Sequence, residues 1–119
     1  MTKQDNIDDG TAAIKAFTEY IARIGDSECK RYASIALNNN DVQQHIKSHA
    51  NRDESADNVI CLPTQIGARI VFIFKCNPPR ICIIPPAFLV KIDTDNEVFE
   101  ITDPYVIQNN IVLQEEGRL

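Results

Sequence analysis

Residues 68–102 consist of short apolar runs separated by polar or proline-rich breaks. The runs are rich in β-branched and aromatic residues, and the breaks contain Asn, Asp and Pro, a pattern typical of an antiparallel meander. We expect four to five strands, with runs at residues 58–62, 68–76, 81–84, 87–92 and 98–102 and a further segment at 106–107 and 111–113.

The run over residues 68–76 is apolar on both of its faces. Its side chains form two alternating sets, Ile70, Phe72 and Phe74 on one face and Val71 and Ile73 on the other. A strand that is apolar on both faces is usually central or covered on both sides. We therefore expect this strand to be the centre of the sheet.

The later predicted strands are interrupted by prolines and by a polar turn, and the last of them alternates between apolar and polar residues. Pro85 and Pro86 cannot donate to a ladder, so they indicate an edge, a bulge or a kink, and an exposed edge there could pair with a second copy. Residues 93–96 read as a tight turn, because Asp and Asn tolerate positive φ. Beyond that turn, the alternation places Phe99 and Ile101 on one face and Glu100 on the other.

The first half of the chain has helical periodicity. Apolar residues at spacings of three and four, preceded by capping residues, predict helices over residues 11–24, 27–37 and 41–50. Asp26 or Ser27 would cap the second helix, and Asp41 the third. Residues 51–58 are polar and read as a connecting loop.

The chain of 119 residues has the size of a single domain. We expect a flexible segment at 1–9, a helical half at 10–50 and a sheet half at 58–113. Segregated helices and strands indicate an α+β domain with N-terminal helices packed on a C-terminal antiparallel β-meander. Such an arrangement would be cystatin-like or related to the nuclear-transport-factor-2 fold.

The net charge of −5 changes the set of candidate partners. It argues against nucleic acid, whose binding depends on neutralising phosphates with Lys and Arg. It favours a basic protein partner. The acidic N-terminus does not resemble a secretory signal, and the longest apolar run is too short to span a bilayer, so we expect a cytoplasmic location and no membrane association.

The four cysteines, Cys29, Cys61, Cys76 and Cys82, show no CxxC spacing. A hairpin centred on Pro79 would bring Cys76 and Cys82 opposite each other, so a disulfide between them is geometrically possible. For a cytoplasmic protein the expected state is nevertheless free thiols that act as small core hydrophobes.

Asp41, His45 and His49 recur every four residues on the third predicted helix. Two histidines at this spacing share a helix face and can ligate one zinc ion. The ligand set is incomplete, so we interpret the three residues as a solvated helix face and predict no metal. A cysteine paired with one of the histidines would supply a nucleophile and a base, but we predict neither catalytic residues nor a cofactor.

Five acidic residues gather around the last hairpin: Asp93, Asp95, Glu97, Glu100 and Asp103. An acidic surface of this kind speeds association with a basic partner by electrostatic steering. A polar turn followed by a solvated strand face would produce the same pattern. We take these five residues as the candidate partner-binding surface.

The sequence over residues 86–98, PAFLVKIDTDNEV, resembles a hairpin of small bacterial immunity proteins. In several such families an apolar strand ends in Val-Asp, followed by a turn usually containing Thr-Gly and then by Glu-Val. Here the turn is shorter, and Asn96 stands where Gly is usual. The resemblance implies a compact protein that binds and neutralises a toxin, without catalytic residues.

Taken together, these features predict a non-enzymatic protein-binding module, most concretely an immunity protein or inhibitor that occludes a bacterial toxin or effector. The alternative is a small-ligand-binding protein or pocket enzyme, because a helix layer on a curved sheet can enclose an apolar pocket. A homodimer is compatible with either function.

Overall fold

The structure is a computed structural model that describes residues 9–107. Three helices precede four strands, which confirms the expected α+β class. The elements are α1 (Asp9–Ala22), α2 (Ser27–Leu37), α3 (Asn40–Asn51), β1 (Glu54–Thr64), β2 (Gly67–Cys76), β3 (Ala87–Asp93) and β4 (Val98–Thr102). The proposed segment at 111–113 and most of the segment at 1–9 lie outside the described residues.

Side-chain caps fix where the second and third helices begin. The Asp26 side chain accepts a hydrogen bond from the Cys29 amide at 2.8 Å, as expected for α2. The third helix is capped by Asn39 rather than Asp41, since its side chain accepts from the amides of Asp41 and Val42. Among the described residues, no helix has the length and apolar character needed to cross a bilayer.

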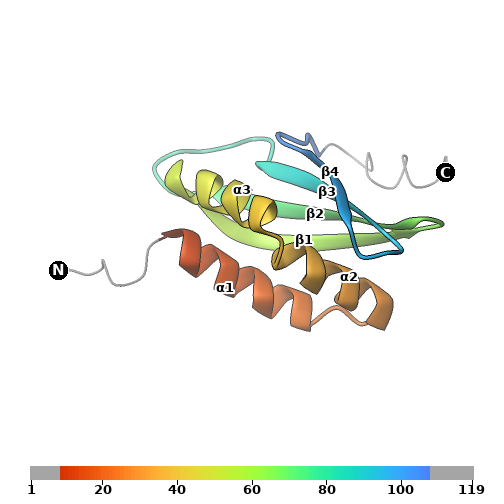
Figure 1. The fold of residues 1–119 in the computed structure, drawn as a ribbon. Helices are drawn as coiled ribbons and strands as arrows, with labels where there is room; N and C mark the ends of the chain where they lie inside the picture. Colours follow the sequence, from red (N-terminus) through yellow and green to blue (C-terminus); the bar gives the residue numbers. More distant parts are fainter. Residues whose placement is uncertain (1–8, 108–119) are drawn as a thin grey trace.

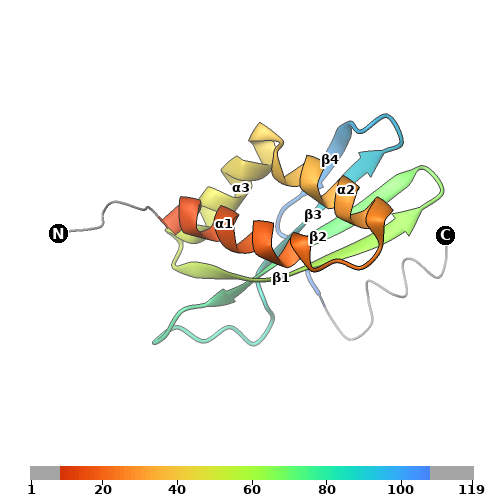
Figure 2. The same cartoon turned by 90° about the horizontal axis from the view of Figure 1, so that it is seen from below.

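The four strands form one antiparallel sheet in the order β1-β2-β3-β4. The helices lie together on one face of this sheet (Figure 1), and the view from below shows α1, α2 and α3 covering it (Figure 2). Strand β2 pairs with β1 on one side and β3 on the other, so it is central, as its composition predicts.

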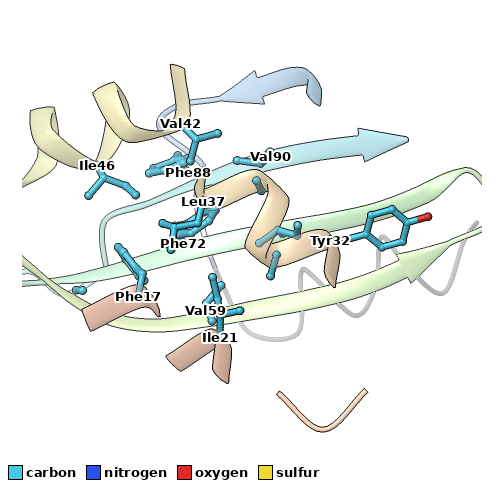
Figure 3. Packing of buried hydrophobic residues seen from close by; sticks show 14 of the residues in the cluster. Phe17, Ile21, Tyr32, Leu37, Val42, Ile46, Val59, Phe72, Phe88 and Val90 are labelled. Atoms are coloured by element: carbon cyan, nitrogen blue, oxygen red, sulfur yellow. The ribbon is translucent and has the colours of Figure 1, made fainter. Parts of the chain in front are cut away.

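The main core lies between the helices and the sheet (Figure 3). The Phe17 ring of α1 meets Phe72 and Phe74 of β2 edge-on, with centroids 5.1 and 5.2 Å apart. Phe72 also stacks on Phe88 of β3 at 5.0 Å. All four phenylalanines are fully buried, and such ring pairs stabilise a core beyond the area they bury.

A smaller apolar cluster covers part of the other sheet face. Val71, Ile73, Ala87 and Leu89 are buried there, packed against partly buried residues that include Tyr105 and Ile107. Strand β2 is therefore buried on both faces, as expected. Tyr105 and Ile107 supply this covering contact, and residues 106–107 form no strand, contrary to the sequence prediction.

The sheet differs from the prediction at three further places. Strand β1 begins at Glu54, inside the segment expected to be a loop. Residues 81–84 form no strand, because the prolines on either side lack a backbone amide and leave only a short run able to join a ladder. A register shift between Lys91 and Ile92 turns Phe99 outwards, so that Val98 and Ile101 pack on the core instead.

All four cysteines form disulfides, Cys29 with Cys61 and Cys76 with Cys82. The expectation of free thiols was wrong. The disulfide between Cys76 and Cys82, which the sequence indicates to be geometrically possible, is formed. The first pair joins α2 to β1 across 32 residues and was not anticipated. It forms because packing of α2 on the sheet brings Cys29 against Cys61, a tertiary contact that spacing in the sequence does not reveal.

Replacing Phe72 by Ala should lower the free energy of unfolding by about 3–5 kcal/mol, because it leaves a cavity at the centre of the core. Chemical denaturation followed by circular dichroism measures this loss. The same substitution at the half-exposed Phe99 is the matched control and should cost about 1 kcal/mol or less. Equal losses in the two variants would contradict the central position of β2.

Candidate functional site

The turns of the two hairpins lie side by side at one end of the sheet (Figures 1 and 2). The register places Gly67, after the β1–β2 turn, opposite Asp93, before the β3–β4 turn. Gly67 has a φ of 144°, and a Cβ there would collide with the Ile92 carbonyl oxygen. Only glycine therefore permits this close approach of the two hairpins.

The β3–β4 turn is held rigidly by its own hydrogen bonds. Asp93 Oδ1 accepts from the amides of Asp95 and Glu97 at 2.9 and 3.0 Å. Asn96 adopts a φ of 68°, which confirms the expected positive φ in this turn. These contacts place the Asp93 carboxylate inside the turn, where it accepts hydrogen bonds from the backbone. The neighbouring side chains of the turn are exposed to solvent.

Arg31 of α2 anchors the same turn from outside. Its Nη1 donates to Asn96 Oδ1 at 2.6 Å, and its guanidinium lies 4.4 Å from the centroid of the Tyr32 ring. Its Nε donates to Glu28 Oε1 at 3.0 Å, and this hydrogen bond raises the pKa of the Arg31 guanidinium above its usual value. The turn is thus fixed to the helix layer as well as to the sheet.

The exposed carboxylates of this hairpin differ in their surroundings. Glu100 pairs with Lys91, its Oε1 lying 3.3 Å from the lysine Nζ. Asp95 and Glu97 are exposed, and neither carboxylate has an ion-pair partner within residues 9–107. Their negative charge is therefore available to a partner.

A hollow of about 340 Å³ lies beside this turn, between the two hairpins. We call it the tip hollow. Its apolar lining is Ile66, Ala68, Ile92 and Phe99, and its polar lining includes Arg69 and Lys91. Sequence reasoning missed this feature because the register shift that turns Phe99 outwards is not encoded in simple alternation. An isoleucine in the turn between Gln65 and Gly67 was the available signal.

Asp103 is not part of this acidic surface. It follows β4 at the far end of the strand, and its side chain is only 13% exposed. Its Oδ2 lies 2.7 Å from His45 Nδ1, and both of its carboxylate oxygens lie 3.1 Å from His49 Nε2. Of the five predicted residues, the structure brings Asp93, Asp95 and Glu97 together in the turn, with Glu100 on the adjacent strand.

His49 is buried, which corrects the expectation of a solvated helix face. The side chain is 2% exposed, and its ring stacks on Phe74 with centroids 4.4 Å apart. Its Nδ1 lies 2.6 Å from Glu54 Oε1, so carboxylates flank the ring at both nitrogens. The spacing of Val42, Ile46 and His49 by four and three residues was the signal that His49 continues the buried stripe.

Two arginines complete the cluster around Glu54, whose side chain is also 2% exposed. Arg80 Nη2 lies 3.2 Å from Glu54 Oε2, and Arg80 Nη1 donates to the Arg52 carbonyl at 2.6 Å. Arg52 Nη2 approaches His49 Nδ1 at 3.0 Å, but the shorter 2.6 Å contact assigns that nitrogen to Glu54. Opposite charges offset one another, which is how a buried carboxylate is tolerated.

The surroundings of His49, Glu54 and Asp103 bear on whether these residues could bind a metal ion or take part in nucleophilic catalysis. Both ring nitrogens of His49 face carboxylates, and residues 9–107 contain no cluster of three or more side chains suited to a metal ion. All four cysteines are in disulfides, so none is a thiol available to either histidine as a nucleophile. The burial and mutual contacts of Glu54, His49 and Asp103 are typical of a stabilising cluster, and we take the exposed hairpin tips as the candidate binding site.

Comparisons with protein families, with curated proteins and with solved structures found no match. Function is therefore inferred from the geometry of this chain.

Replacing Glu54 by Leu should lower the free energy of unfolding by about 1–3 kcal/mol, because it leaves the buried Nδ1 of His49 without its carboxylate partner and removes the carboxylate that Arg80 contacts. The control is Glu100→Leu, which removes a carboxylate from a surface pair and should cost less than about 1 kcal/mol. Urea denaturation of both variants gives the comparison. A small loss in Glu54→Leu would show that the buried cluster does not stabilise the fold.

Proposed function

We propose that this protein is a non-enzymatic protein-binding module, most concretely an immunity protein or inhibitor that occludes a bacterial toxin or effector. Its contact surface would be the tip hollow together with the β3–β4 turn beside it. The observation that carries this proposal is the placement of an open apolar hollow next to exposed carboxylates that have no ion-pair partner among residues 9–107.

This placement matches the anatomy of protein interfaces, in which an apolar centre is surrounded by a polar rim. Ile66 and Phe99 are large apolar side chains left exposed at the hollow. Asp95 and Glu97 stand on the neighbouring turn, and residues 93–100 contain four acidic residues and no basic one. The rim therefore favours a partner with a basic surface around an apolar contact.

The rigidity of the turn favours a role as a binding surface over a role as a simple connection between two strands. The Asp93 hydrogen bonds and the Arg31–Asn96 contact fix the turn before any partner arrives. A pre-formed surface loses less conformational entropy on binding, so more of the contact energy appears as affinity. In an inhibitor, such a turn would cover the basic active site of the target and exclude its substrate.

The alternative function, small-ligand binding, also has one supporting observation. A hollow of about 340 Å³ with a mainly apolar lining falls within the size range of ligand pockets, about 300–1,000 Å³. Its position at the hairpin tips differs from the pocket expected between helices and sheet, where Phe72, Phe88 and His49 fill the interior. An apolar ligand of modest size is the class that this hollow would accept.

The cellular compartment of the protein determines which partners it can meet. A cytoplasmic location remains a prediction, and the two disulfides weigh against it, because such bonds persist mainly in oxidising compartments. We propose that the protein meets its partner in the bacterial periplasm or outside the cell. A secreted or periplasmic toxin would suit both the disulfides and the acidic surface.

The test combines identification of the partner with a matched pair of charge reversals. A tagged protein is used to capture its partner from the native periplasm or medium, and affinity is then measured by calorimetry with purified components. Asp95→Lys with Glu97→Lys should weaken binding at least tenfold, with the melting temperature nearly unchanged because both side chains are exposed. Asp93 is kept, because it holds the turn.

The control variant is Glu19→Lys with Asp57→Lys, which changes the net charge equally at exposed positions away from the hairpin tips. Equal weakening in both variants would mean that only net charge matters and would remove the hairpin from the interface. Neutralisation of the partner's activity by the wild-type protein would establish inhibition. A bound small apolar molecule and no protein partner would favour the alternative function instead.

A further inference from the structure

The loop between β2 and β3 presents isoleucine side chains to solvent. We call residues 77–86 the isoleucine loop. Ile81 is 88% exposed and Ile83 is 96% exposed, and Ile84 is about half exposed. Large apolar side chains exposed close together in one loop are a candidate interaction site, because contiguous exposed apolar patches mark such sites.

The exposure of these side chains is not a result of a loose loop. The Cys76–Cys82 disulfide closes its first half. Arg80 binds the Arg52 carbonyl and the Glu54 carboxylate, and the Asn77 amide donates to the Asp53 carbonyl at 3.1 Å. The loop is therefore fixed to the body of the protein, with its isoleucines directed away from the core.

The isoleucine loop and the two hairpin turns lie at opposite ends of the sheet (Figures 1 and 2), and the tip hollow is lined by residues at those turns. Their properties are complementary. The loop and its base, residues 75–86, contain two basic residues and no acidic one, whereas residues 93–100 contain four acidic residues and no basic one. The loop offers protruding apolar side chains, and the hollow offers an apolar recess with Ile66 and Phe99 exposed.

We propose that the isoleucine loop of one molecule docks into the tip hollow of a second copy of this chain. Ile81 and Ile83 would contact Ile66 and Phe99 of the other molecule. Arg80 is already held by Glu54, so Lys75 is the cation free to face the exposed Asp95 and Glu97. The occupant is a second copy because both the apolar and the charged features of the loop have their counterparts on this same chain.

The two contact surfaces differ, so the association is head-to-tail. Contacts of this kind produce an open chain of molecules or a closed ring, not a dimer with twofold symmetry. A loop tip entering a hollow of this size makes a small interface, and small interfaces are weak and transient. Self-association should therefore depend on concentration and decline as salt screens the charges.

This inference uses the same tip hollow as the proposed function and rests on its ability to bind protein. A second copy in the hollow would cover the surface offered to the partner, so self-association would compete with partner binding. The two proposals can fail separately. The present one is tested with purified protein alone, and the proposed function is tested with the captured partner.

The experiment is sedimentation velocity of the purified, oxidised protein over a wide range of concentration. The loop variant is Ile81→Asp with Ile83→Asp, and the hollow variant is Ile66→Asp with Phe99→Asp. All four side chains are at least half exposed, and circular dichroism with thermal melting verifies that each variant folds. The control carries Thr18→Asp with Ala22→Asp on the exposed side of α1.

We expect the average mass of the wild type and of the control to rise with concentration, while each variant alone stays monomeric. Mixing the two variants should restore association, because the intact loop of the hollow variant can enter the intact hollow of the loop variant. Association should stop at one-to-one complexes, because the other loop and the other hollow of each pair are disrupted. A wild type that is monomeric throughout would overturn the proposal, as would variants that fail to combine. Binding of the monomer to anionic phospholipid vesicles, lost in the loop variant, would assign the loop to a membrane surface instead.

Discussion

Burial of β2 on both faces is the constraint on which the other elements depend. Phe72 and Phe74 face the helix layer, whereas Val71 and Ile73 face the cluster on the opposite side. A strand covered in this way must also be paired along both edges, and β1 and β3 supply those pairs. Because the register of β2 with β3 sets Gly67 opposite Asp93, the same constraint brings the hairpin tips together.

The buried charged cluster joins the third helix to the start of β1 and to the segment after β4. His49 comes from α3, Glu54 begins β1, and Asp103 follows β4, so their contacts connect three separate elements. Arg80 extends the cluster to the isoleucine loop. Burying a charge is costly unless it is paired, so the cluster forms only when all these elements are in place. It thereby fixes the isoleucine loop relative to the core and to the hairpin tips.

Features set by local sequence were predictable. Asp26 and the apolar spacing after it define α2, and the residues allowed in a tight turn define residues 93–96. The central position of β2 followed from its two apolar faces.

Features set by tertiary contact were not predictable. Glu54 looks like a loop residue until α3 and the arginines surround it, and Cys29 meets Cys61 only once α2 packs on the sheet. Residues 81–84 have strand-like composition, but the prolines around them leave no continuous set of amides for a ladder. The acidic turn was found from the sequence, whereas the hollow beside it depends on a register shift.

The structure thus places two apolar features at opposite ends of one rigid core, and we assign the acidic end to partner binding. Amide hydrogen exchange of the protein, alone and with its captured partner, tests that assignment most directly because it maps contact without any substitution. Slower exchange at residues 64–69 and 91–99, with α1 unchanged, is the predicted result. Slowing confined to the helix layer, with the hairpin tips unaffected, would contradict it.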